Sequence, residues 1–108
     1  MAFKTLFMAH APDADKAKHR AAIETAKYHL FVVVVRNQAE AVEVSREFRR
    51  QEKIDSILLC PGFTHGDAAE IFAALENKVA VSVARGDGPG SRLAMEAMTR
   101  EKFFEPPN

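Results

Sequence analysis

The fold is decided by the stretch HLFVVVV at residues 29–35, which places four consecutive valines after an aromatic residue. Short apolar runs rich in β-branched and aromatic residues are typical of β-strands. Three further runs, at residues 3–9, 54–60 and 79–84, have the same character. Because these runs are largely continuous rather than alternating, they favour strands that are covered on both faces, as in parallel sheets.

Helical segments are predicted between and after these strands. They span residues 13–27, about 37–52, about 65–77 and 91–102. The first opens with the candidate N-caps Asp13 and Asp15, and the second has Asn37 followed three residues later by Glu40, as in a capping box. The breaker-rich tail, residues 105–108, is predicted to be irregular.

The predicted strands begin about 25 residues apart, near positions 3, 29, 54 and 79. Strands that alternate with helices at this spacing indicate βαβ units and a parallel sheet. We therefore expect one α/β domain over residues 1–108, with a small, open, mainly parallel sheet of four strands. The assumed strand order is 2-1-3-4 with helices on both faces, which is a flavodoxin-like or half-Rossmann arrangement.

Composition and charge exclude several classes of protein. The 108 residues carry 15 basic and 15 acidic side chains, so the basic footprint of a nucleic-acid-binding protein is missing. The longest apolar run, residues 30–35, is too short to cross a membrane. The apolar stretch at residues 5–9 is too short for a signal peptide, and a single cysteine fits a reducing compartment, so we expect a cytoplasmic protein.

The topology indicates where a site would be. In open parallel sheets, ligands bind beyond the carboxyl ends of the strands, where the strand order reverses. With the assumed order, this edge would bring together His10, Cys60, His65 and Arg85, which are far apart in the sequence. This concentration of chemically capable side chains is the main functional signal of the chain.

The candidate catalytic residues are Cys60, His65 and His10. The thiol could act as a nucleophile and the imidazoles as acid or base. The alternative for Cys60 is a small buried hydrophobic residue, which is the commoner fate of a free cysteine.

The candidate ligand-binding residues are Thr64, Gly66, Arg85, Gly86 and Asp87. A helix that starts at Thr64 would present backbone N–H groups to an anion, and Gly66 would allow close approach. The guanidinium of Arg85 can hold a carboxylate or phosphate with two hydrogen bonds. The alternatives are a purely structural helix cap, since Thr64 and the acidic residue three positions on form a capping pattern, and an ordinary surface ion pair for Arg85.

A metal site and a nucleotide site are both disfavoured. His10, His65, Cys60 and Asp87 are metal-ligand types, but the chain has no short ligand pair such as C-x-x-C. The segment GDGPG at residues 86–90 breaks the G-x-G-x-x-G pattern and follows the fourth strand rather than the first. We therefore predict no metal and no cofactor.

Several segments resemble a known protein family. They are CPGFTH at residues 60–65, DAAE at 67–70, KVAVSVAR at 78–85, DKAKHR at 15–20 and AEAVEV at 39–44. The chain is similar over nearly its whole length to an uncharacterised, domain-of-unknown-function family of roughly hundred-residue single-domain α/β proteins. Pro61 departs from the family's usual Cys-Gly-Gly-Phe at this position. The resemblance implies a compact α/β fold and assigns no catalytic residue.

Two functions remain open. One is a small-molecule site, for binding or catalysis, that takes an anionic metabolite at the carboxyl ends of the strands. The other is a non-enzymatic interaction module that forms a homo-oligomer, with a two-fold dimer favoured, because Met95, Met98, Phe103 and Phe104 offer apolar surface near the C-terminus.

Overall fold

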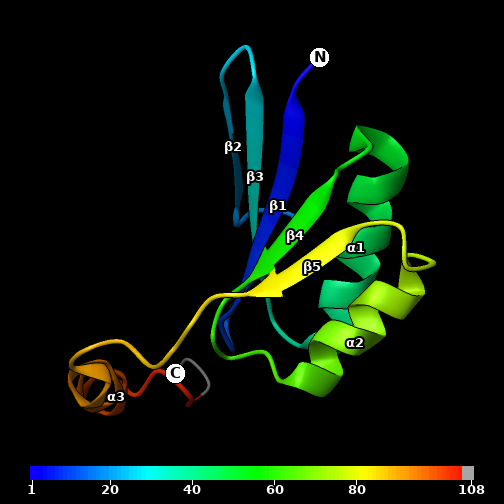
Figure 1. The fold of residues 1–108 in the computed structure, drawn as a ribbon. Coiled ribbons are helices and arrows are strands. Elements are labelled where there is room, and N and C mark those ends of the chain that lie inside the picture. The colour runs from blue at the N-terminus through cyan, green and yellow to red at the C-terminus, as the bar shows by residue number, and fades with distance from the viewer. Residues whose placement is uncertain (106–108) are drawn as a thin grey trace.

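A computed structural model describes residues 1–105, so most of the tail that is predicted to be irregular, residues 106–108, lies outside the described residues. The described chain forms these elements in order (Figure 1): β1 (Phe3–His10), β2 (Arg20–Glu24), β3 (Tyr28–Val35), α1 (Gln38–Glu52), β4 (Ser56–Leu59), α2 (His65–Ala74), β5 (Ala80–Val83) and α3 (Ser91–Arg100). No helix among these residues combines the length and the apolar character that a membrane crossing requires.

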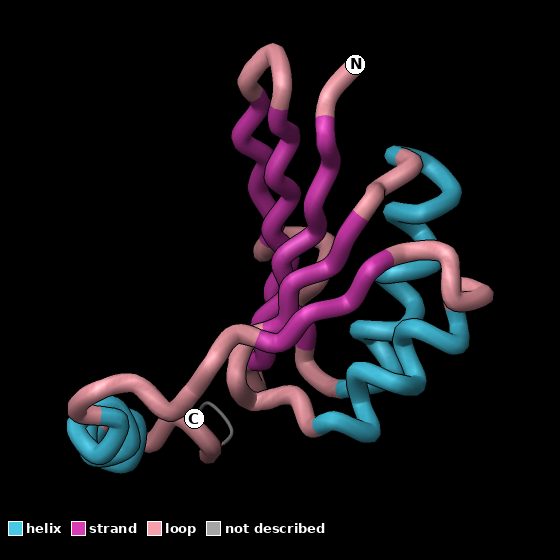
Figure 2. The backbone as a smooth tube through the Cα atoms, in the orientation of Figure 1, coloured by secondary structure: helices cyan, strands magenta, loops and turns pink. Residues whose placement is uncertain are grey.

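The strands form one sheet in the order β2-β3-β1-β4-β5. Strands β3, β1, β4 and β5 run parallel, and β2 pairs antiparallel with β3, as the adjacent strands in Figure 2 show. The predicted α/β class and mainly parallel sheet are therefore confirmed. The predicted count of four strands and the order 2-1-3-4 are matched only in part, because β2 adds a fifth strand outside β3.

The predicted helix over residues 13–27 is wrong. Residues 12–19 form turns, in which the Asp15 carboxylate accepts a hydrogen bond from the Ala17 N–H, and residues 20–24 form β2. The hydroxyl of Thr25 accepts hydrogen bonds from the N–H groups of Lys27 and Tyr28 and so closes the β2–β3 hairpin. An alanine-rich helix here would bury little apolar area, whereas the hairpin pairs the outer edge of β3, which would otherwise carry unpaired backbone groups.

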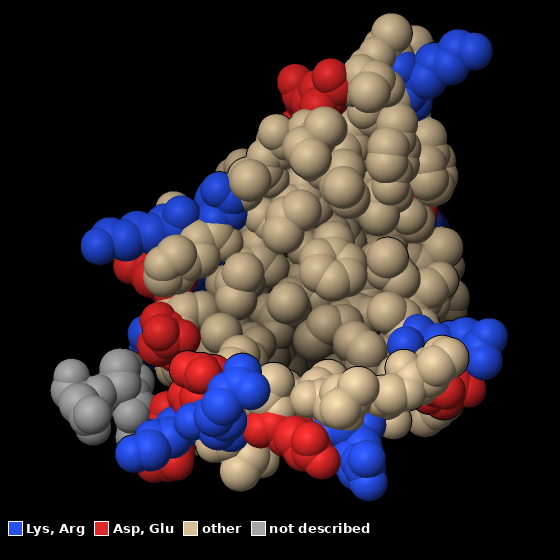
Figure 3. Space-filling view, turned by 90° about the vertical axis from the view of Figure 1, so that its left-hand side faces the viewer, with Lys and Arg blue, Asp and Glu red and all other residues tan. Residues whose placement is uncertain are grey.

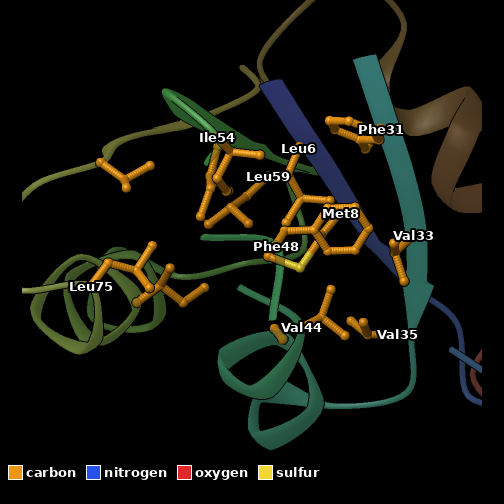
Figure 4. Close-up of a cluster of buried hydrophobic side chains, with 14 of the residues drawn as sticks. Leu6, Met8, Phe31, Val33, Val35, Val44, Phe48, Ile54, Leu59 and Leu75 are labelled. Atoms are coloured by element: carbon orange, nitrogen blue, oxygen red, sulfur yellow. The ribbon is translucent and has the colours of Figure 1, made fainter. Parts of the chain in front are cut away.

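Helices α1 and α2 cover one face of the sheet (Figure 1). Every second residue of a strand points to this face, and the fully buried side chains Leu6, Met8, Val33 and Leu59 do so. They pack with Phe48 and other residues of α1 and α2, as Figure 4 shows. The amide oxygen of the Asn37 side chain accepts a hydrogen bond from the Glu40 N–H, so the predicted N-cap of α1 is present.

We call the opposite side of the sheet the open face. By strand register it is formed by Phe3, Thr5, Phe7, Ala9, Ala21, Ile23, Tyr28, Leu30, Val32, Val34, Ser56, Leu58, Ala80 and Ser82. None of these residues is charged, and Figure 3 shows a broad uncharged surface on this side with charged side chains only at its margins.

The prediction of helices on both faces is wrong for a topological reason. The chain moves across the sheet in one direction from β1 to β3 and in the other direction from β3 through β4 to β5. Right-handed crossovers in opposite directions place their helices on opposite faces. Because the connection from β1 to β3 contains the strand β2 instead of a helix, the open face has no crossover helix.

The C-terminal helix α3 does not cover the open face either. It is amphipathic, yet none of its residues is buried, and it lies beyond the carboxyl ends of the strands at the end of an extended segment (Figure 1). Gly90 precedes it with a left-handed φ of 75° and provides no side-chain cap. The helix predicted over residues 91–102 is present over Ser91–Arg100.

Candidate functional site

Three segments lie at the carboxyl ends of β1, β4 and β5, at residues 10–12, 60–66 and 84–88, and together they form what we call the carboxyl edge. The segments lie against one another. A Cβ on Gly86 would stand only 3.0 Å from Cβ of Pro61, so glycine at this position permits close packing of two of the loops. A Cβ on Gly62 would lie 3.6 Å from both Cys60 Sγ and His10 Nδ1.

His10 is the last residue of β1, the central strand of the sheet. Its ring stacks on that of the buried Phe63, with centroids 3.8 Å apart and planes inclined by 24°. The Nε2 atom is shielded from solvent and has no hydrogen-bond partner among the described residues. Burial lowers the pKa of His10, and the negative charge of Asp67 opposes this shift only in part. The imidazole is therefore favoured in its neutral form.

Cys60 directly follows β4 and is half-buried, with its backbone N–H donating to the carbonyl of Met8. Its Sγ and the Nδ1 of His10 are both 3.6 Å from the Cβ position of Gly62, so these two atoms are no more than twice that distance apart. No hydrogen bond joins the thiol to an imidazole within residues 1–105. The structure thus brings the thiol and the neutral imidazole into one place without forming a nucleophile–base pair.

The start of α2 carries the predicted capping box. The Thr64 hydroxyl accepts from the Asp67 N–H at 3.0 Å, and the Asp67 carboxylate accepts from the Thr64 N–H at 2.9 Å. The first N–H groups of a helix have no partner within the helix, so those of His65 and Gly66 face outward. The cap is structural, but it leaves two donors at the carboxyl edge.

Arg85 and Asp87 form a two-bond ion pair, with Nε to Oδ1 at 2.9 Å and Nη2 to Oδ2 at 3.0 Å. This hydrogen bonding raises the pKa of Arg85 and lowers the pKa of Asp87. The side chains are 84% and 67% exposed, and such exposed pairs contribute little to stability. Asp87 therefore occupies the guanidinium edge to which a ligand carboxylate would bind.

The predicted site residues divide into two groups. His10 and Cys60 lie side by side in the inner part of the carboxyl edge, whereas His65, Arg85 and Asp87 are exposed in its outer part. Sequence reasoning missed Phe63, the residue on which His10 stacks. A single aromatic residue between Gly62 and Thr64, in a loop of otherwise small or polar residues, was the available signal.

Concave regions are also present away from the carboxyl edge. One of about 630 Å³ is lined by basic residues that include Arg46, Arg49, Arg50 and Lys78, and it lies where α1 and α2 end. Arg49 donates to the Leu75 carbonyl at 2.9 Å. Cations are favoured at helix C-termini, so capping accounts for much of this basic groove. We favour the carboxyl edge as the candidate site for two reasons. The buried Nε2 of His10 has no hydrogen-bond partner among the described residues, and the strand order reverses at this edge.

Among residues 1–105, no three His, Cys, Asp or Glu side chains gather in a way that could hold a metal ion.

Comparison with known proteins identifies the family of the chain and adds no name for its activity. No curated protein and no solved structure matches it. A family model described as a family of unknown function, DUF6506, matches residues 3–99 and so covers most of the sequence. The α/β sheet described above is therefore the fold of a member of that family, and the chain belongs to the family of unknown function DUF6506.

Proposed function

We propose that the protein binds a small molecule at the carboxyl edge, between the ends of β1 and β4. The observation that carries the proposal is the Nε2 atom of His10, which is shielded from solvent and has no partner among the described residues. Buried polar atoms without a partner are costly, and this one lies where the strand order reverses, the usual ligand position in open parallel sheets. A ligand that reaches Nε2 when the surrounding segments move apart would remove that cost.

The donors around His10 favour a ligand with a hydrogen-bond acceptor, such as a carboxylate or a phosphate. A neutral imidazole can donate from Nε2, and the N–H groups of His65 and Gly66 supply two further donors at the N-terminus of α2. Arg85 is close enough in the sheet order to contribute if a ligand carboxylate replaces the exposed carboxylate of Asp87. The negative charge of Asp67 favours a ligand of low total charge.

Gly66 provides independent support. A Cβ at this position would meet only the Thr64 hydroxyl, at 3.7 Å, so an alanine fits the fold. Glycine in the middle of a helix costs roughly 0.5–1 kcal/mol relative to alanine, and Gly66, the second residue of α2, carries part of that cost. The glycine therefore lowers stability without a packing reason, and close approach of a ligand to the backbone would explain it.

The proposal concerns binding and assigns no chemical step. Cys60 and His10 are the reactive groups nearest the site, but no hydrogen bond between them is present among residues 1–105. The free thiol of Cys60 is compatible with the reducing cytoplasm that the sequence predicts.

Cys60 is the reporter for the test because it is the one cysteine of the chain. The rate of its alkylation by iodoacetamide is measured with an excess of phosphate, acetate or, as the reference, chloride at equal ionic strength. We expect phosphate or acetate to slow the reaction several-fold in the wild type. The Gly66→Ala variant should lose this protection, whereas Gly88→Ala should keep it, because a Cβ on Gly88 meets nothing within 4 Å.

Equal rates in all three salts would contradict an acceptor-binding site next to Cys60. Equal protection in the wild type and in Gly66→Ala would contradict the role given to the start of α2.

A further inference from the structure

We propose that two copies of this chain associate through their open faces to form a two-fold dimer, with α3 of each copy packing against the other. This inference concerns a different surface from the carboxyl edge and does not depend on the proposed ligand.

The charged side chains of strand β2 point to one side of the sheet and its Ile23 points to the other. Arg20 and Glu24 share one side of this edge strand, the side of α1 and α2, whereas Ala21 and Ile23 lie on the open face. Arg20 is held there by the Glu47 carboxylate, 3.0 Å away, and by the ring of Phe48. Edge strands facing water normally carry polar residues, yet the Ile23 side chain is 62% exposed on the uncharged side.

Two polar side chains of the open face form a hydrogen bond with each other, and two of its aromatic rings stack. The hydroxyls of Thr5 and Ser56, on neighbouring strands, bond to each other at 2.9 Å. Phe3 stacks on Tyr28 with ring centroids 5.9 Å apart, which places two aromatic rings on the same face. The hydrogen bond between Thr5 and Ser56 lowers the cost of removing water from these two hydroxyls.

The open face is large enough for a stable interface when α3 is included. Five strands of four to eight residues, spaced about 4.8 Å apart with a rise of about 3.3 Å per residue, cover on the order of 450 Å². The ten residues of α3 present roughly 150 Å² more, from a rise of 1.5 Å per residue and a width of about 10 Å. Two copies would then bury roughly 1,200 Å², at the lower end of the range for specific interfaces.

The occupant that fits is a second copy. An uncharged apolar face is complementary to itself, which is the requirement of a two-fold interface, where both copies use the same surface. Figure 3 shows α3 along the lower margin of the open face, with a hollow between them. In this position α3 covers none of its own sheet, but its exposed Leu93 can reach a sheet packed against the open face.

The test is analytical ultracentrifugation of the full chain over a range of concentrations, with two matched variants. Ile23→Lys places a charge on the open face, and Ala22→Lys places the same charge on the neighbouring residue, which points to the other side of β2. Both positions are exposed on an edge strand, so both variants are expected to fold, and circular dichroism checks this. Phe3→Lys, at a side chain that is 53% exposed, is a second open-face variant should Ile23→Lys fail to fold.

We expect a wild-type dimer whose dissociation constant rises at least tenfold in Ile23→Lys, or in Phe3→Lys, and changes less than threefold in Ala22→Lys. A wild type that stays monomeric at all concentrations overturns the proposal, as does a dimer that the open-face variants leave unchanged. A dimer that both lysine variants of β2 weaken equally also overturns it, since that result indicates pairing through the β2 edge.

Discussion

Leu58 and Leu59 are adjacent in β4 and point to opposite faces of the sheet, so they test the assignment of the core directly. Leu59 is fully buried and pairs in register with Met8 of β1 and Val83 of β5. Replacing a buried leucine with alanine costs roughly 3–5 kcal/mol, from the lost transfer free energy and the cavity that remains. We expect Leu59→Ala to lower the free energy of unfolding by about 3 kcal/mol.

Leu58 is the matched control, with the same side chain in the same strand but on the open face. Because this face has no layer above it in the monomer, Leu58→Ala leaves no closed cavity, and we expect a loss of about 1–1.5 kcal/mol from transfer alone. The measurement is urea unfolding followed by circular dichroism, at a protein concentration where ultracentrifugation shows monomers. With a slope of about 1–3 kcal/mol per molar urea, Leu59→Ala should move the midpoint by roughly 1–3 M. Equal losses for the two variants, or a larger loss for Leu58→Ala, would refute the assignment of the core to the α1–α2 side.

Three further predictions concern single positions. Thr64→Ala should lower the free energy of unfolding by about 1 kcal/mol in the same urea assay, because it removes one half of the capping box, while Thr64→Ser should cost less. Burial lowers the pKa of His10 below 6.5 in the folded state, so the unfolded chain binds more protons and the folded chain loses stability as the pH falls below about 6.5. The His10→Asn variant should lose this part of the pH dependence. Parallel curves of stability against pH for the wild type and the variant would contradict the lowered pKa of His10. Ala22→Val should leave the stability unchanged or raise it by up to about 1 kcal/mol, since β-branched residues favour strands; a loss of about 0.6 kcal/mol is what a helix at residues 13–27 would give.

Local sequence signals correctly predict the elements whose local preference agrees with the tertiary structure. The run at residues 29–35 forms β3, and the side chains of Asn37 and Thr64 accept hydrogen bonds in the first turns of α1 and α2. In these places, β-propensity and capping agree with the tertiary structure. Agreement between local preference and global fold is what makes such segments predictable.

The helix prediction for residues 13–27 is wrong because the local preference of these residues and their tertiary structure disagree. Alanine and lysine favour a helix in isolation, but β3 required a pairing partner at its outer edge, and residues 20–24 provide one. The sequence around this segment contains no signal for that requirement. The sequence correctly predicts the helix α3. That α3 packs against no other described element of its own chain depends on the missing crossover helix, and the local sequence gives no sign of it.

The candidate site was predictable in its position but not in its contacts. The parallel order of β1, β4 and β5 places His10, Cys60 and Arg85 at one edge, and this follows from topology alone. The stack of His10 on Phe63 and the ion pair of Arg85 with Asp87 depend on the conformations of loops. Propensity and spacing carry no information on such contacts.

The most direct test of the ligand site is a ¹H–¹⁵N correlation spectrum of the ¹⁵N-labelled protein, titrated with sodium phosphate and separately with sodium acetate. The proposed function predicts saturable shifts concentrated at the amides of Ala11, Gly62, His65 and Gly66 for at least one of these anions. Shifts confined to the basic groove around Arg46, Arg50 and Lys78, or no saturable shifts with either anion, would contradict a ligand site at the carboxyl edge.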